Sequence, residues 1–324
     1  MNFDLDEGQL DFASMAKKFF SANAGPGAAR ALLDGGTDYK PGLKQIAELG
    51  FYGITVPESA GGIGQSMLDL AVVAEQAGHA LASPSMVTAA RAAVLLDGQD
   101  ELLAALVDGS KRFAVVDGAA PSIDAAYADT FLAMDGTSLV VGSGSVQAGE
   151  AIDPTRGLAT VILEETTVLR EDAVALWDRA RLAALIAMAA EDLGMASAAL
   201  EMGVDYANTR EVFGRKIGSY QAVKHPLVDV YVGVEQLRSL VWWAAWTFDN
   251  DPAEAQLAAS AAKAQAAQVG ELATETLIQV HGGIGFTWEH DAHLFWRRAK
   301  VDRLLLGDAT EHFDRVAELT LEAV

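Results

Sequence analysis

Three residues whose side chains suit a phosphate-bearing, flat ligand lie within one short stretch of the chain. Arg210, Phe213 and Gln221 belong to the segment Arg-Glu-Val-Phe-Gly-Arg-Lys-Ile-Gly-Ser-Tyr-Gln. An arginine can donate to two phosphate oxygens at once, a phenyl ring can pack against a planar ligand, and a glutamine amide can both donate and accept. Gly214 and Gly218 predict a helix stop and a tight connection, which would bring the three side chains together. The stretch therefore favours a ligand that carries phosphates and a flat ring.

Long patterns of apolar residues at helical spacing flank this stretch and would position it. The predicted long helices cover about 176–208, 221–249, 252–280 and 288–322. Four such helices fit an antiparallel four-helix domain. Upstream, helical patterns give way at Phe113 to short β-type runs that are separated by turns. We therefore predict a mainly α protein with a small central β domain. The three predicted parts are an N-terminal helical domain (1–112), a reduced β domain (113–172) and a C-terminal four-helix domain (173–324).

Composition limits the classes of partner. The net charge of −22 argues against binding to nucleic acid or to an anionic membrane surface. A small anion could still bind where Arg210, Arg215 and Lys216 cluster in one loop. The chain has no cysteine, which excludes disulfides and thiolate metal sites. Charges interrupt every apolar run before it reaches transmembrane length, and the acidic N-terminus lacks the basic region of a secretory signal. We expect a cytoplasmic protein.

Three separate stretches resemble the acyl-CoA dehydrogenase family. The Arg210–Gln221 stretch is similar to the family pattern R-x-x-F-G-x-x-I-x-x-x-Q. The second stretch is Gln-Val-His-Gly-Gly-Ile-Gly-Phe at 279–286, and the third is Leu-Gly-Phe-Tyr-Gly-Ile-Thr-Val-Pro-Glu at 49–58 with the glycine-rich run that follows it. Each stretch alone is a weak signal, but their order and spacing over about 280 residues make a specific joint match. The resemblance implies an acyl-CoA dehydrogenase-like fold.

The resemblance also implies a cofactor, FAD, and residues that contact it. Arg210 would contact the pyrophosphate, Phe213 would pack against the cofactor, and Gln221 would hydrogen-bond near its ADP half. The segment that would complete this site consists of Gln279, Val280, His281, Gly282 and Gly283. In the family these residues reach across a subunit interface to the FAD of a neighbour.

The catalytic base of the family is missing at both positions that can carry it. The reaction removes an α-proton from an acyl-CoA with a glutamate while the flavin accepts a hydride from the β-carbon. In register, the two glutamate positions fall at Leu306 and Ala184, and neither side chain can take a proton. Asp308 and Glu191 are the nearest substitutes, although Asp308 would more simply be an exposed or capping carboxylate. The flavin-facing segments Glu-Pro-x-x-Gly-Ser-Asp and Trp-Ile-Thr-Asn of the family's β domain are absent as well.

One cluster of histidines and acids was considered as a metal site. His290 and His293 are three residues apart, with Glu289 and Asp291 beside them. The zinc pattern H-E-x-x-H needs a spacing of four. The cluster therefore predicts a solvated helix cap and no metal.

These observations leave three hypotheses. The first is a non-catalytic subunit of a heteromeric acyl-CoA dehydrogenase, similar to the paired subunits that form α2β2 heterotetramers in actinobacterial steroid catabolism. Its partner, a second acyl-CoA dehydrogenase subunit, would supply the base and bind most of the acyl-CoA, whose acyl group would be a steroid side-chain or ring remnant. The second is a self-sufficient homo-oligomer with a relocated base, and the third is a FAD-free structural or interaction subunit.

Overall fold

The N-terminal part of the chain is helical in the computed structural model, which describes residues 4–35, 40–83 and 85–322. Its α-helices are α1 (Glu7–Asn23), α2 (Pro26–Leu33), α3 (Lys40–Glu48), α4 (Met67–His79), α5 (Met86–Leu95) and α6 (Asp100–Val107), and the short 3-10 helices are η1 (Phe51–Gly53) and η2 (Glu58–Ala60). Helix α4 begins with a capping box: the Ser66 side chain accepts from the backbone N–H of Asp69, and the Asp69 side chain accepts in return from the backbone N–H of Ser66.

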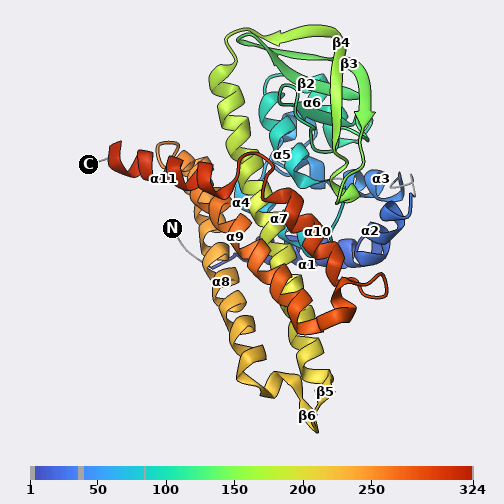
Figure 1. The fold of residues 1–324 in the computed structure, drawn as a ribbon. Coiled ribbons are helices and arrows are strands. Elements are labelled where there is room, and N and C mark those ends of the chain that lie inside the picture. Colours follow the sequence, from blue (N-terminus) through green and yellow to red (C-terminus); the bar gives the residue numbers. More distant parts are fainter. Residues whose placement is uncertain (1–3, 36–39, 84, 323–324) are drawn as a thin grey trace.

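A small sheet follows these helices. Its strands are β1 (Phe113–Val116), β2 (Thr130–Asp135), β3 (Ser138–Ala148) and β4 (Ala159–Arg170), and they lie in the order β1-β2-β3-β4. Strands β1 and β2 are parallel, and the other neighbours are antiparallel. A short 3-10 helix, η3 (Pro154–Arg156), precedes β4. The sheet sits at one end of the molecule (Figure 1), and the predicted fold, mainly α with a small central β domain, is confirmed. The three domain limits remain predictions.

Three long helices carry the C-terminal half: α7 (Val174–Thr209), α8 (Gln221–Asn250) and α9 (Ala255–His281). Within the described part of the chain, α7 alone is long and apolar enough to cross a membrane, and 89% of its apolar window is buried inside the protein. Its apolarity is accounted for by its place in the core, where it packs against α4, α5, α8 and α9. It runs through the length of the molecule in Figure 1.

The prediction of one long helix over 288–322 was wrong. The structure has two helices there, α10 (Ala292–Asp302) and α11 (Ala309–Glu322). The helical conformation is interrupted at Leu306 and Gly307, whose φ angles are +61° and +103°. Both angles are far from the right-handed helical region, and glycine is the residue that adopts them most easily. Helix α11 projects from the side of the bundle in Figure 1.

Helix α7 reaches its place because two glycines let it touch α4. A Cβ atom at Gly78 would lie 1.9 Å from the backbone oxygen of Glu191, and one at Gly194 would lie 1.8 Å from the backbone oxygen of Glu75. Any larger residue would therefore push the two helices apart. Their close crossing places the side chain of Glu191 beside the segment that joins α4 to α5.

A buried ion network links the sheet to the helices. Arg156 is fully buried, and its guanidinium group pairs with Glu191 on α7 and with Asp302 on α10. The contacts with Asp302 are Nε–Oδ1 at 2.6 Å and Nη2–Oδ2 at 2.5 Å. Arg298 on α10 reaches back to η3 and donates from Nε to the Asp153 carboxylate at 2.7 Å. Two arginines thus tie the turn before β4 to the helical core.

Two further ionisable groups, Asp192 and Lys263, complete this network. Burial raises the pKa of Asp192 well above its ordinary value, and the neighbouring Asp302 adds to the effect. Burial also lowers the pKa of Lys263, which donates from Nζ to the backbone oxygen of Asp302 at 3.1 Å. For Asp302, burial opposes ionisation, but the charge of Arg156 outweighs it and lowers the pKa. The Asp302 carboxylate is therefore the ionised centre of the network, and the raised pKa of Asp192 favours its neutral form.

Replacing Arg156 with methionine should cost about 3–5 kcal/mol of unfolding free energy, because it leaves two buried carboxylates without their counter-charge. Arg112→Met is the matched control, since the Arg112–Asp129 ion pair (3.0 Å) has half-exposed side chains and should contribute less than about 1 kcal/mol. Urea unfolding measures both. Equal losses in the two variants would contradict the assignment of Arg156 as the main link between sheet and helices.

Candidate functional site

The stretch singled out by its sequence forms one tip of the helical bundle, at the end opposite the sheet (Figure 1). Helix α7 ends at Thr209, and Arg210 is its C-cap residue. A two-stranded hairpin follows, β5 (Glu211–Val212) and β6 (Arg215–Lys216), and then a short 3-10 helix, η4 (Ile217–Ser219). Helix α8 begins at Gln221. The structure therefore brings Arg210, Phe213 and Gln221 to the same tip, as the sequence predicts.

Phe213 has an unusual backbone conformation. Its φ is +54°, and that of Gly214 is +75°, so these two residues form the turn of the hairpin with both φ angles positive. A bulky residue rarely adopts a positive φ, because the conformation costs energy. The Phe213 side chain is 93% exposed, so packing within this chain does not repay that cost. The Phe213 ring is therefore presented to solvent on a strained turn.

The hairpin is nevertheless held in place. The Tyr220 hydroxyl donates to the backbone oxygen of Val212 at 3.1 Å, and the Arg215 guanidinium lies 3.9 Å from the centre of the Tyr220 ring. The backbone N–H of Ile217 donates to the oxygen of Arg210 at 2.9 Å. These contacts fix the backbone on both sides of the turn.

The polar side chains around the turn are exposed to solvent. Arg210, Gln221 and Gln279 are all exposed. In the three described ranges of the chain, no carboxylate lies within ion-pairing distance of the Arg210 guanidinium. An uncompensated arginine on a chain of net charge −22 is a local site for an anion.

An aromatic stack joins the second predicted segment to the first. The His281 ring, at the end of α9, stacks on Tyr206 of α7 with ring centres 4.1 Å apart. Burial lowers the pKa of His281 and outweighs its hydrogen bond, so the ring is neutral at pH 7 and its Nδ1–H donates to the backbone oxygen of Leu277 at 2.8 Å. Tyr206 lies one helical turn, or about 6 Å, before Arg210. The stack therefore places Gln279–Gly283 near the same end of the bundle.

Tyr206 is the one member of this arrangement that the sequence analysis missed. Its position four residues before Arg210 places it on the same face of α7. This spacing of four residues is the signal in the sequence that could have identified Tyr206. Nothing in the sequence shows that its partner is His281, because the two residues are 75 positions apart.

The two glycines after His281 lie at an open surface. Gly282 has φ +64° and ψ −142°, a conformation that essentially only glycine adopts. A Cβ atom at Gly282 or Gly283 would meet nothing within 4 Å, so packing within this chain does not require a small residue. The N–H of Gly282 already donates to Gln279, at the end of α9. A ligand would therefore approach the Cα side of Gly282. The last part of this segment, η5 (Gly282–Phe286), leads away along the surface.

Neither predicted base position can carry a proton. Ala184 is fully buried in α7. Leu306 lies in the loop between α10 and α11, on the wall of a cavity of about 380 Å³. Its backbone oxygen accepts from Arg181 Nη2 at 2.8 Å and lies 3.0 Å from His312 Nε2. The cavity wall includes two carboxylates, but Asp117 pairs with Arg91 at 2.5 Å and Glu311 lies 3.5 Å from Arg181.

The two substitute carboxylates have other roles in the fold. Asp308 is exposed and accepts from the backbone N–H of Glu311 at 3.0 Å at the start of α11, and this hydrogen bond lowers the Asp308 pKa. Glu191 is 2% exposed. It pairs with Arg156 and accepts from the backbone N–H of Met86 at 2.7 Å. One carboxylate caps a helix, and the other belongs to the buried network.

His290 and His293, near the start of α10, both accept local hydrogen bonds. The Ala292 N–H donates to His290 Nδ1 at 3.1 Å, and Arg297 Nε donates to His293 Nδ1 at 3.2 Å. The described residues contain no group of three or more histidines, aspartates and glutamates arranged to hold a metal ion.

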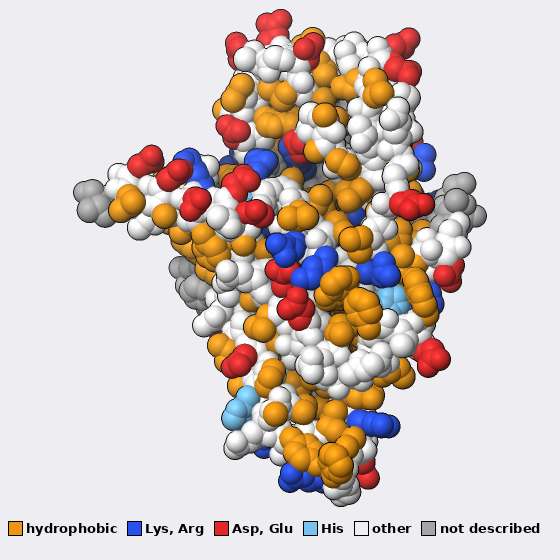
Figure 2. Space-filling model, in the orientation of Figure 1, with side chains coloured by type: hydrophobic (Ala, Val, Ile, Leu, Met, Phe, Trp, Pro, Cys, Tyr) orange, Lys and Arg blue, Asp and Glu red, His pale blue; other side chains and the backbone are white. Residues whose placement is uncertain are grey.

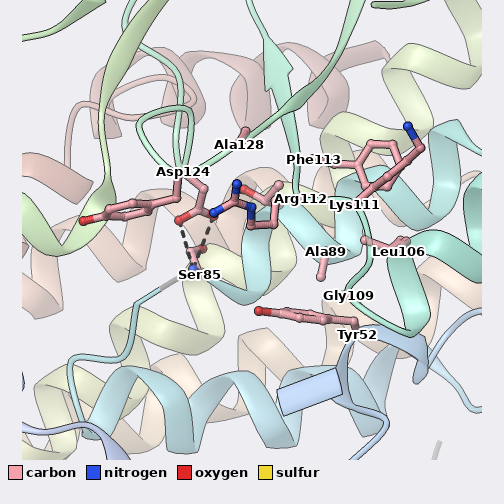
Figure 3. Close-up of a pocket in the computed structure, with 12 residues that line it drawn as sticks. Tyr52, Ser85, Ala89, Leu106, Gly109, Lys111, Arg112, Phe113, Asp124 and Ala128 are labelled. Atoms are coloured by element: carbon pink, nitrogen blue, oxygen red, sulfur yellow. Dashed lines mark hydrogen bonds between the residues drawn. The ribbon is translucent and has the colours of Figure 1, made fainter. Parts of the chain in front are cut away.

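A small cavity of about 50 Å³ lies between the N-terminal helices and the sheet (Figure 3). Asp124 is buried on its wall, where it accepts from the backbone N–H of Ser85 at 3.1 Å and from Thr88 Oγ1 at 2.6 Å. Figure 3 shows Asp124 directed toward Ser85, with Tyr52 on another side of the cavity. Burial raises the pKa of Asp124 to about 7. The carboxyl group thus titrates near neutral pH at the contact between two parts of the fold.

The raised pKa of Asp124 predicts a pH-dependent stability. Between about pH 4 and pH 7 the folded state keeps a proton that the unfolded state releases, so this group's contribution is complete below about pH 4 and is lost as the pH rises toward 7. Relative to Asp124→Asn, the wild type should lose up to about 1.4 kcal/mol per pH unit in this range and nothing further above it. Urea unfolding at several pH values measures the difference. Parallel curves for the two proteins would contradict the prediction.

Comparison with known proteins identifies the family. The family model of the acyl-CoA dehydrogenase N-terminal domain matches residues 6–106, and that of the acyl-CoA dehydrogenase C-terminal domain matches residues 183–320. The chain is 36% identical to acyl-CoA dehydrogenase IpdE2 of Mycolicibacterium smegmatis over 299 residues, which cover 91% of this chain and 93% of the relative.

Two solved structures share the fold. A chain of the ChsE4–ChsE5 complex from Mycobacterium tuberculosis is 25% identical with a TM-score of 0.87, and the match covers 99% of both chains. A chain of the Tcur3481–Tcur3483 steroid ACAD variant is 25% identical with a TM-score of 0.86, and the match covers 98% of both chains. Together with the matched domains, these similarities establish that the chain belongs to the acyl-CoA dehydrogenase family.

Proposed function

We propose that this chain is a non-catalytic subunit of a heteromeric, FAD-dependent acyl-CoA dehydrogenase. The observation that carries the proposal is a contrast between two sites. At the bundle tip, Arg210 has no carboxylate partner among the described residues, and Phe213 presents an exposed ring on a strained turn. At the usual base positions, Leu306 and Ala184 offer no ionisable group. The chain retains residues that suit a cofactor's phosphates but has no base in register.

The tip suits the ADP half of FAD. Arg210 can hold the pyrophosphate with a bidentate guanidinium, and the Phe213 ring can pack against the flat parts of the cofactor. Gln221 and Gln279 can hydrogen-bond to it, and the open face of Gly282 gives it room. When bound, FAD supplies the hydride acceptor of the reaction. All five residues lie on the surface, which suits a cofactor that is held mainly by another subunit.

The partner in this proposal is a second acyl-CoA dehydrogenase subunit. It carries the catalytic glutamate, the pocket for the flavin ring and most of the acyl-CoA site, and two copies of each chain form an α2β2 heterotetramer in the cytoplasm. The solved ChsE4–ChsE5 complex supports a heteromeric assembly for this fold. The substrate class we propose is a CoA thioester of a steroid side-chain or ring remnant, which is supported by similarity to the Tcur3481–Tcur3483 steroid ACAD.

Flavin absorbance tests whether FAD is held mainly by the partner subunit. The chain purified alone should contain no flavin, whereas co-expression with its partner subunit should give about one FAD per heterodimer. Stoichiometric FAD on the isolated chain would overturn the proposal that the partner holds the cofactor, and would instead support a self-sufficient enzyme.

Arg210→Ala should lower the FAD affinity of the assembled complex by roughly 10- to 100-fold, because a charge-assisted pair with phosphate is worth about 1.5–3 kcal/mol. Arg315→Ala is the matched control: Arg315 is a surface arginine on α11 that pairs with Glu318 at 3.1 Å, away from the tip. Fluorescence of released flavin measures occupancy in both variants. Unchanged occupancy in Arg210→Ala would instead support a FAD-free structural subunit.

The competing hypothesis, a relocated base, makes a separate prediction. If the base lies on the partner, Asp308→Asn should leave turnover of the assembled complex within about twofold of the wild type and should change its stability little, because asparagine caps a helix about as well as aspartate. Glu191→Gln should lower the unfolding free energy while turnover per correctly folded complex is kept. A loss of turnover of 1,000-fold or more in either folded variant would identify a base on this chain.

A further inference from the structure

We infer that an exposed aromatic ridge beside the glycine loop is the surface on which the partner acyl-CoA dehydrogenase subunit docks. The ridge consists of Phe286, Trp288, Trp296 and Arg297. It begins in η5 and ends on α10, directly after the glycines proposed to face the cofactor. The inference rests on the proposed function and adds to it a location and a chemistry for the partner contact.

The first observation is the exposure of large rings. Phe286 is 62% exposed and Trp288 is 60% exposed, and Trp296, which contacts Phe286, is half-buried. Figure 2 shows hydrophobic side chains beside Lys and Arg side chains over the region that α10 occupies in Figure 1. Clustered exposed aromatic residues on a folded chain mark an interaction site, and tryptophan and arginine are the residues most enriched among those that dominate binding energy.

The second observation is that the rings are already fixed. Phe286 packs edge-on against Trp296, with ring centres 5.5 Å apart, and Trp288 packs edge-on against His293 at 5.1 Å. The backbone oxygen of Trp288 accepts from Arg30 Nη1 at 2.6 Å, which anchors the loop to helix α2. Docking would therefore order few side chains, and this lowers the entropic cost of association.

The third observation concerns charge. Arg297 lies over the Trp288 ring, 5.4 Å from its centre, and donates to His293 and to the backbone oxygen of Ile152. No carboxylate among the described residues pairs with Arg297. The chain as a whole has a net charge of −22, so this cation is available to an acidic group of an approaching protein. The surface fits a partner that offers an apolar recess for Trp288 and a carboxylate for Arg297.

Continuity with the proposed cofactor contact selects the occupant. Gly283 and Phe286 belong to the same 3-10 helix, which rises about 2 Å per residue, so their backbones are only about 6 Å apart. A subunit that brings a cofactor to Gly283 must also cover Phe286 and the rings beside it. The partner that holds FAD is therefore the occupant we assign to the ridge.

The test uses the purified chain and the acyl-CoA dehydrogenase subunit that forms a flavin-containing complex with it. The affinity of the two chains is measured by titration calorimetry for wild type, for Trp288→Ala and for Phe286→Ala. Loss of an anchoring ring should weaken the complex by about 30-fold or more, whereas the isolated chain should stay folded with only a small change in thermal unfolding, because each ring packs edge-on against one other ring of the chain. Ile162→Ala and Leu321→Ala are matched controls, because both side chains are exposed and apolar, at 52% and 75%, but lie on β4 and α11. They should stay within about threefold of the wild type.

Charge is tested separately with Arg297→Glu and Arg297→Lys. The reversal should weaken the complex more than the conservative change, and it should reduce the loss of affinity on raising the salt concentration. Wild-type affinity in Trp288→Ala and Phe286→Ala would overturn the inference. Self-association of the isolated chain that Trp288→Ala abolishes would also overturn it, by assigning the ridge to a second copy.

The two proposals fail in different ways. If no flavin-containing complex forms with the wild-type chain, the proposed function is wrong. If that complex forms, needs Arg210 for its FAD and assembles normally with Trp288→Ala, the proposed function stands and only the docking surface is wrong.

Discussion

The salt bridges of Arg156 with Glu191 and Asp302 are the interaction on which the rest of this structure depends. They join three segments that are far apart in the sequence: the turn before β4, the middle of α7 and the end of α10. Charges buried this deeply are tolerated only when each has its counter-charge, so the geometry of all three segments is fixed together. Apolar contacts of Phe113 and Leu132 with Leu95 and Leu103 hold the sheet against the N-terminal helices, and the ion network adds a polar link to α7 and α10.

Charged side chains have different environments at the two ends of the molecule. Near the sheet, guanidinium groups and carboxylates are buried and paired. At the bundle tip, Arg210 remains at the surface, with no carboxylate partner in the described chain. The first pattern serves folding, and the ion pair with Arg156 occupies Glu191, one of the two substitutes for the missing base. The second leaves binding capacity for something outside the chain.

Much of this arrangement could be predicted from the sequence. Helical periodicity identified α7, α8 and α9 to within a few residues, and the stretch from Arg210 to Gln221 did form one compact tip. Two features were out of reach. The break between α10 and α11 depends on left-handed backbone angles at Leu306 and Gly307, which a helical pattern does not reveal. The Tyr206–His281 stack, which brings the two predicted segments together, depends on the packing of α7 against α9.

The loop at Leu306 is held by its backbone. Arg181 and His312 both contact the carbonyl oxygen of residue 306, and a carbonyl oxygen is the same whatever side chain follows it. These two contacts hold the loop independently of the side chain at 306, which itself packs against the core. A different side chain at this one position would therefore change the chemical groups that line the cavity while keeping the two hydrogen bonds that hold the loop.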